Sequence, residues 1–253
     1  MTSVAVWLGT LILYVPTPHG GGFVSADSRY DAGEPARRDE AQKIFLCGRA
    51  AVCAVSGGLR LDVTTDEGNA GTLDISALLE RTSTAMRANE DQTPEALLAS
   101  LRSAMYAGML GFWDKFLAGR RVAAPMSMRL GAPSVCTILF VAPGSVAQVQ
   151  FPLIERRGSD GLWTHDLREP MTRDADPLRP LAQGHTECVS PSEKLPANPN
   201  ELEALYAPAR ETESCRDVIG GAVDIAVIED GVARWLQRKG PKPLATGGNP
   251  TIQ

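Results

Sequence analysis

The residues best able to do chemistry stand near the start of the chain: Thr10, Asp27, Lys43 and the turn glycine Gly57. Lys43 follows Asp27 by sixteen residues, and Gly57 follows Lys43 by fourteen. A threonine hydroxyl is a weak nucleophile at neutral pH unless a base accepts its proton. An N-terminal threonine carries that base in its own α-amine, whose pKa is about 8. Thr10 can therefore act in this way only after the peptide bond from Gly9 is cut.

Other catalytic and metal-binding arrangements have little support. The three histidines, His19, His165 and His185, are too scattered to favour a metal site or a Ser-His pair. The cysteines are odd in number and contain no Cys-x-x-Cys pair, which argues against a zinc site or a disulfide framework. They are Cys47, Cys53, Cys136, Cys188 and Cys215. We expect no metal and no cofactor.

Several short segments resemble the proteasome β-subunit family of N-terminal-nucleophile hydrolases, including its bacterial homologues. Ala26-Asp27-Ser28-Arg29 is similar to the family's Ala-Asp-Ser-Arg segment, and Lys43 stands at the family's distance from the aspartate. Gly57 falls at the oxyanion-hole glycine. Gly9-Thr10 falls where the family is cut to free its catalytic threonine. Arg216-Asp217 and the glycine-rich strand that follows also resemble the family's carboxy-terminal segment.

The resemblance implies a role for each of these residues. Thr10 would be the nucleophile, and Lys43 would lower the pKa of its hydroxyl. Asp27 would pair with Lys43, and the backbone N–H of Gly57 would donate to the oxyanion. Asp217 would complete the catalytic set by helping to hold the amino terminus, and Ser28 and Arg29 would be supporting residues. The expected function is hydrolysis of amide bonds in a peptide or protein substrate by a threonine peptidase, assembled as a homo-oligomeric ring.

The chain departs from the family pattern in ways that leave alternatives open. Thr2, exposed by removal of the initiator methionine, is an alternative nucleophile, but it lies 25 residues before Asp27 and would need a large bulge. Val218-Ile219 occupy the stretch where the family has a serine. A non-catalytic structural subunit and a small-molecule amidohydrolase of the same group are the alternative functions.

Composition narrows the class of partners and the location. The 253 residues are 43% hydrophobic, and 25 basic against 30 acidic residues give a net charge of −5. The basic residues are scattered, which argues against a nucleic-acid partner. The longest apolar run, Val4 to Val15, is shorter than the roughly 18 residues of a membrane span. We expect a cytoplasmic protein that does not enter a membrane, with export to the periplasm as the alternative if the apolar start is a truncated signal peptide.

Hydrophobic periodicity predicts strands, then two helices, then strands, a helix and strands. The predicted helices cover 75–86, 93–117 and 200–215, and Pro208 should bend the last. The predicted strands cover 11–15, 23–26, 44–47, 50–55, 134–142, 146–154, 222–228 and 232–236.

This order and the resemblance predict an α+β fold, a four-layer α-β-β-α sandwich with helices outside two sheets. Residues 1–9 would be a propeptide or leader remnant, residues 10–238 one domain with a loop-rich insert at about 156–199, and residues 239–253 a disordered tail. Apolar residues crowd more than one face of the 93–117 helix, which favours a contact with a second ring.

Overall fold

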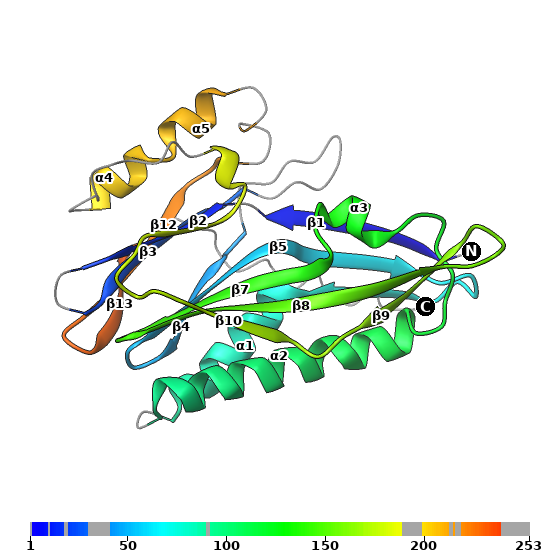
Figure 1. The fold of residues 1–253 in the computed structure, drawn as a ribbon, viewed down its shortest axis with the longest axis horizontal. Helices are drawn as coiled ribbons and strands as arrows, with labels where there is room; N and C mark the ends of the chain where they lie inside the picture. Colours follow the sequence, from blue (N-terminus) through cyan, green and yellow to red (C-terminus); the bar gives the residue numbers. More distant parts are fainter. Residues whose placement is uncertain are drawn as a thin grey trace, which may run out of the picture.

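The computed structural model describes residues 2–9, 11–17, 20–29, 41–89, 92–188, 199–212, 215 and 219–238. Of these residues, 46% lie in strands and 26% in helices. The strands form two sheets, and every pair of neighbouring strands within them is antiparallel. Figure 1 shows the two sheets stacked, with the larger one extending well past the smaller.

The larger sheet has eight strands built around the long strand β5 (Ala51–Thr64). Its main path runs β1-β5-β7-β8-β10, while β4 and β6 also pair with β5, and β9 pairs with β8. The other bounds are β1 Ser3–Gly9, β4 Ile44–Gly48, β6 Ala70–Asp74, β7 Ser134–Ala142, β8 Ser145–Arg157, β9 Trp163–Leu167 and β10 Met171–Ala175.

The smaller sheet has five strands in the order β11-β2-β3-β12-β13. Their bounds are β2 Leu11–Pro16, β3 Gly22–Asp27, β11 Leu181–Gly184, β12 Val223–Glu229 and β13 Val232–Gln237. The chain therefore passes from the larger sheet to the smaller one between Gly9 and Leu11. Strands β9, β10 and β11 lie in the segment that we expected to be loop-rich.

Two long helices, α1 (Ile75–Arg87) and α2 (Pro94–Phe116), cover the outer face of the larger sheet (Figure 1). The N-cap of α2 is as expected, because the Thr93 hydroxyl accepts from the Ala96 N–H at 3.3 Å and Pro94 begins the helix. The short helix α3 (Met126–Leu130) follows them in the chain. None of the described helices is long and apolar enough to cross a bilayer.

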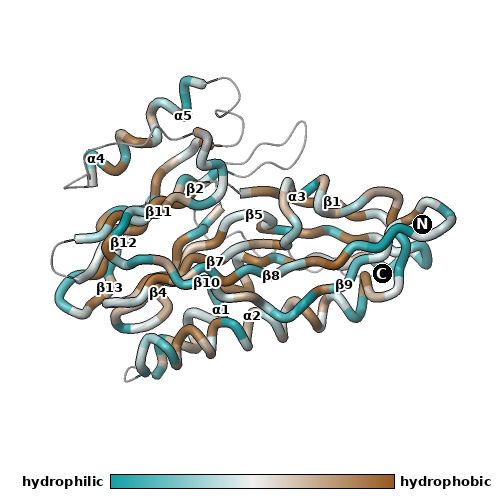
Figure 2. The backbone as a smooth tube through the Cα atoms, in the orientation of Figure 1, coloured by the Kyte–Doolittle hydropathy of each residue, from teal (hydrophilic) through white to brown (hydrophobic). Residues whose placement is uncertain are grey.

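The apolar residues of α2 are used within the chain. Its buried stripe consists of Leu97, Leu101, Met105, Met109 and Trp113. The remaining large apolar side chains of the helix are half-buried against the same core. Figure 2 shows the apolar residues following the strands and the covered side of the helices. The crowding of α2 therefore gives no independent support for a second ring.

The expected four-layer α-β-β-α sandwich is wrong, because the protein is mostly β-sheet with few helices. The segment predicted as one long helix over 200–215 forms two short ones, α4 (Pro199–Ala204) and α5 (Ala207–Glu211). Pro208 lies in the first turn of α5, where its missing N–H is tolerated, and it cannot continue a preceding helix. Leu202 and Tyr206 pack this short pair on the smaller sheet.

Two disulfide bonds, Cys47–Cys53 and Cys188–Cys215, contradict the expectation of no disulfide framework. Cys136 is a buried free cysteine. Cys47–Cys53 joins the neighbouring strands β4 and β5, so its partners are brought together by a hairpin. Cys188 follows the edge strand β11, whereas Cys215 precedes the turn that leads to β12. Spacing alone did not reveal either pair.

The longer-range disulfide should contribute more to stability. Replacing Cys188 and Cys215 by alanine should lower the free energy of unfolding by about 2–4 kcal/mol, because the bond closes a long loop in the unfolded chain. Replacing Cys47 and Cys53 by alanine is the matched control, and its loss should be smaller because that loop is short. Urea unfolding followed by circular dichroism measures both. An equal or larger loss in the Cys47/Cys53 variant would contradict this account.

Candidate active site

A buried ion pair lies at the end of the smaller sheet. The Lys43 Nζ is 3.1 Å from Asp27 Oδ1, and neither side chain is exposed to solvent. Asp27 is the last residue of β3, and Lys43 immediately precedes β4, so the pair links the two sheets. Lys43 Nζ also donates to the backbone carbonyl of Arg29. The pairing implied by the resemblance is thus present in the structure.

Backbone N–H groups from separate segments converge on the Asp27 carboxylate. Oδ1 accepts from the Leu11 N–H at 3.2 Å, and Oδ2 accepts from the Gly220 N–H at 3.0 Å and the Arg29 N–H at 3.3 Å. Hydrogen bonds to a carboxylate favour its charged form and offset part of the cost of burying it. The carboxylate therefore fixes the start of β2 against the turn before β12.

Strand β5 carries the glycines expected to bind an oxyanion. Gly57 has a φ of +87°, a conformation that favours glycine. A Cβ on Gly58 would lie 2.6 Å from the Val135 carbonyl oxygen, which excludes a side chain there unless β7 moves. Gly57 pairs with Gly9 on one side and with Cys136 on the other. The backbone of Gly9 is thus held next to Gly57.

One edge of β5 brings Lys43 and Gly9 close together. The Val55 N–H donates to the Lys43 carbonyl at 2.9 Å, and Gly9 pairs with Gly57 two residues further along. Both contacts lie on the edge opposite β7, since β7 pairs with the same part of β5 on the other side. Two residues of strand span about 7 Å. The residue before Thr10 and the lysine are therefore neighbours on one sheet edge.

The other expected site residues divide into three groups. Thr10 and Asp217 lie outside the described residues. Ser28 is buried, and its carbonyl accepts from the Ala41 N–H at 2.9 Å. Thr2 is buried beside the far end of β1, where it bridges to Val122. Because β1 is extended, Thr2 is about 23 Å from Gly9 and is not brought to the ion pair.

Cys136 is the one cysteine thiol of the described chain that lies beside these groups. It is fully buried on β7 opposite Gly57. Burial raises the pKa of its thiol far above the ordinary value, so the nucleophilic thiolate does not form at neutral pH. Among the described residues, no group of three or more His, Cys, Asp or Glu side chains could hold a metal ion.

Three residues at this site were not identified as such from the sequence. The Gly220 N–H contacts Asp27, a role that the glycine-rich sequence of its segment does not indicate. Tyr206 places its hydroxyl 3.1 Å from the Ser25 hydroxyl, and burial raises the pKa of the phenol. Gln183 on β11 is buried and donates to Ser56 Oγ at 2.8 Å and to the Thr137 carbonyl at 3.0 Å. Gln183 lies in the segment without recognisable periodicity, so nothing in the sequence indicated it.

The buried pair should be strongly coupled. Lys43→Met should lower the free energy of unfolding by about 3–5 kcal/mol, because it leaves the buried Asp27 carboxylate without its cation. The double variant Asp27→Asn/Lys43→Met should lose less than the sum of the two single variants. Urea unfolding of all four proteins gives the coupling. Arg234→Met, which breaks an exposed pair with Glu229, is the control and should change stability by no more than about 1 kcal/mol. Additive losses at Asp27 and Lys43 would contradict the pairing.

Comparison with known proteins adds no relative to this account: no protein-family model and no curated protein sequence matches the chain. The resemblance to the proteasome β-subunits therefore depends on the motif residues of this sequence alone.

Proposed function

We propose that the protein is a threonine-type amide-bond hydrolase whose nucleophile is Thr10 after cleavage of the Gly9–Thr10 bond. One observation carries the proposal: the two covalent neighbours of Thr10 are held by the groups such a reaction needs. Gly9 pairs with Gly57, and the Leu11 N–H binds the carboxylate that holds Lys43. The described residues on either side of Thr10 are therefore both anchored.

The chemistry of maturation follows from this arrangement. The Thr10 hydroxyl attacks the Gly9 carbonyl carbon, the C–N bond breaks, and the Thr10 nitrogen takes the hydroxyl proton to become a free amine. Water then hydrolyses the resulting ester and releases the leader as a carboxylate. The Lys43 ammonium stabilises negative charge on the hydroxyl oxygen, and a Gly57 N–H stabilises charge on the carbonyl oxygen.

Substrate hydrolysis repeats the same steps with the new amine as base. The amine accepts the Thr10 hydroxyl proton, the hydroxyl oxygen forms an ester with the substrate acyl group, and the proton passes to the departing amine. Water then hydrolyses the ester and regenerates the hydroxyl. Asp27 keeps Lys43 charged and in place throughout.

The two disulfides bear on location. Structural disulfides form and persist in oxidising compartments and are rare in the cytoplasm. Cys47–Cys53 and Cys188–Cys215 therefore favour the exported alternative over the cytoplasmic one. A homo-oligomeric ring remains a prediction from the resemblance.

Maturation is the direct test of the proposal. Purified protein should contain a species that begins at Thr10, visible by intact mass spectrometry and accompanied by peptide hydrolysis. Thr10→Ala should retain residues 1–9 and be inactive, whereas Thr10→Ser should still be cut because it keeps the hydroxyl. Thr2→Ala is the control and should mature normally.

Two outcomes would reject the assignment. Peptide hydrolysis by protein that keeps its leader would rule out Thr10 as nucleophile. An intact leader with no hydrolysis, in folded protein, would instead favour the non-catalytic structural subunit. One observation supports the structural-subunit function: the whole of β1 is paired with β5.

A further inference from the structure

The larger sheet extends past the end of the smaller sheet beside the candidate site. At this end, β2 begins at Leu11 and β3 ends at Asp27, while β5 continues to Thr64 and β8 to Arg157. The overhang leaves part of the inner face of the larger sheet uncovered by the smaller one (Figure 1). We call this uncovered face the shelf.

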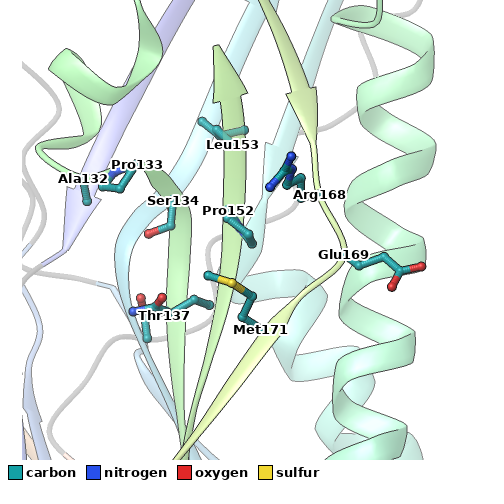
Figure 3. A pocket seen from close by; sticks show the side chains of 10 residues that line it. Ala132, Pro133, Ser134, Thr137, Pro152, Leu153, Arg168, Glu169 and Met171 are labelled. Atoms are coloured by element: carbon teal, nitrogen blue, oxygen red, sulfur yellow. The ribbon is translucent and has the colours of Figure 1, made fainter.

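The shelf holds an open depression of about 740 Å³. Its lining, shown in Figure 3, consists of Ala132, Pro133, Ser134, Thr137, Gln150, Pro152, Leu153, Arg168, Glu169 and Met171. Depressions of this size are typical of sites for small molecules or single side chains. It begins where Gln183 bridges the two sheets through Ser56 and Thr137.

Strand pairing places this depression beside the candidate site. Thr137 pairs with Ser56, the neighbour of Gly57, and also pairs with Gln150, which pairs in turn with Met171. Adjacent strands are about 4.8 Å apart. The near wall at Thr137 is therefore one strand from the candidate oxyanion glycine, and the far wall at Met171 is three strands from it.

The leader identifies which part of a substrate would reach the depression. In the uncut chain, β1 supplies the acyl side of the Gly9–Thr10 bond and lies against one edge of β5. The depression lies across the other edge, over β7 and β8. The acyl part of a substrate would therefore lie on the β1 side of β5. The shelf lies on the other side of β5, from which the amine of the cleaved bond would depart.

The lining of the depression is mainly apolar. Pro133, Pro152 and Leu153 contribute aliphatic surface, and Met171 is 55% exposed although it is a large apolar residue. In Figure 3 the Met171 side chain extends across the depression between Pro152 and Thr137. An apolar group bound here would remove this surface from water, and methionine adapts readily to the shape of such a group.

The depression is lined by one basic and one acidic side chain, Arg168 and Glu169. The Arg168 N–H donates to the Pro152 carbonyl at 2.9 Å, which fixes the arginine beside the depression. Within the described parts of the chain its guanidinium has no carboxylate partner, whereas nearby Arg156 pairs with Asp166. The Glu169 carboxylate points away from the depression in Figure 3. A carboxylate on a bound molecule would complete the hydrogen bonding of Arg168.

We propose that the shelf depression binds the leaving side of the substrate and selects an apolar residue next to a carboxylate. This specificity depends on the proposed amide hydrolysis. The apolar residue fills the space over Pro152 and Met171, and Arg168 binds the carboxylate. The carboxylate comes either from an acidic side chain or from the carboxyl terminus of a short peptide, and the experiment separates these sources.

Turnover of matched peptides tests the selection. Quenched fluorescent peptides carry Leu-Glu, Leu-Gln or Leu-Lys after the cleaved bond, and a shorter pair ends in a leucine carboxylate or a leucine amide. The Leu-Glu peptide should have a kcat/KM about tenfold above the Leu-Lys peptide, because a charge-assisted hydrogen bond replaces a repulsion. Preference for the short carboxylate over its amide without preference for Leu-Glu would identify a terminal carboxylate as the ligand.

Substitutions test whether Arg168 causes the preference for Leu-Glu over Leu-Lys. Arg168→Gln should bring the ratio of Leu-Glu to Leu-Lys close to one, and Arg168→Glu should reverse it. Met171→Ser should weaken selection of leucine over glycine at the first position. Arg157→Gln, which removes an exposed arginine of β8 outside the depression, is the matched control and should leave the ratio unchanged. Hydrolysis with equal rates for all peptides would overturn the specificity while leaving the proposed function intact.

A binding measurement distinguishes failure of the proposed hydrolysis from failure of the proposed binding site. If the protein hydrolyses none of the peptides, the proposed function fails, and calorimetric titration of the full chain with the dipeptides Leu-Glu and Leu-Gln tests the depression alone. Tighter binding of Leu-Glu that is lost in Arg168→Gln would support the binding site. Absent binding of both dipeptides, or binding that Arg168→Gln leaves unchanged, would overturn it.

Discussion

The Asp27 carboxylate is the constraint on which the rest of the site depends. A buried carboxylate is tolerated only when a cation and hydrogen-bond donors replace its water. Here one cation and three backbone N–H groups do so, and they belong to Lys43, Leu11, Arg29 and Gly220. These groups come from segments far apart in sequence, so satisfying one charge also fixes the start of β2, the end of β3, the approach to β4 and the turn before β12.

The long strand β5 connects the segments held by Asp27 with the rest of the larger sheet. One of its edges pairs first with β4 and then with β1, while the other pairs with β7 and then with β6. The change from β4 to β1 occurs between Val55 and Gly57, beside Lys43. A β-carbon at Gly58 would meet the Val135 carbonyl oxygen, so close pairing at this point requires glycine. The passage of the chain from the larger sheet to the smaller one, between Gly9 and Leu11, is therefore fixed by contacts in both sheets.

Local sequence patterns predicted the parts of this architecture that depend on local physics. The capped helix beginning at Pro94 and the β4–β5 hairpin follow from capping and alternation. The prediction of one long helix over 200–215 was wrong, because Pro208 divides the segment into two short helices that rely on packing of Leu202 and Tyr206. Strand β10 escaped notice because it is a short, largely exposed strand with almost no apolar alternation. The disulfide Cys188–Cys215 joins residues whose proximity depends on the whole smaller sheet.

The unequal lengths of the two sheets explain why chemistry would be favoured at this corner. β5 has 14 residues and β8 has 13, whereas β2 and β3 have six each. Sheets of equal length would bury the inner faces of both along their whole extent. The overhang instead leaves an open surface directly beside charges that are shielded from water by the sandwich. Electrostatic interactions are stronger on the shielded side because the local dielectric constant is low. Folding has already removed water from the Asp27–Lys43 pair, so neither charge would have to be desolvated when a molecule binds on the shelf.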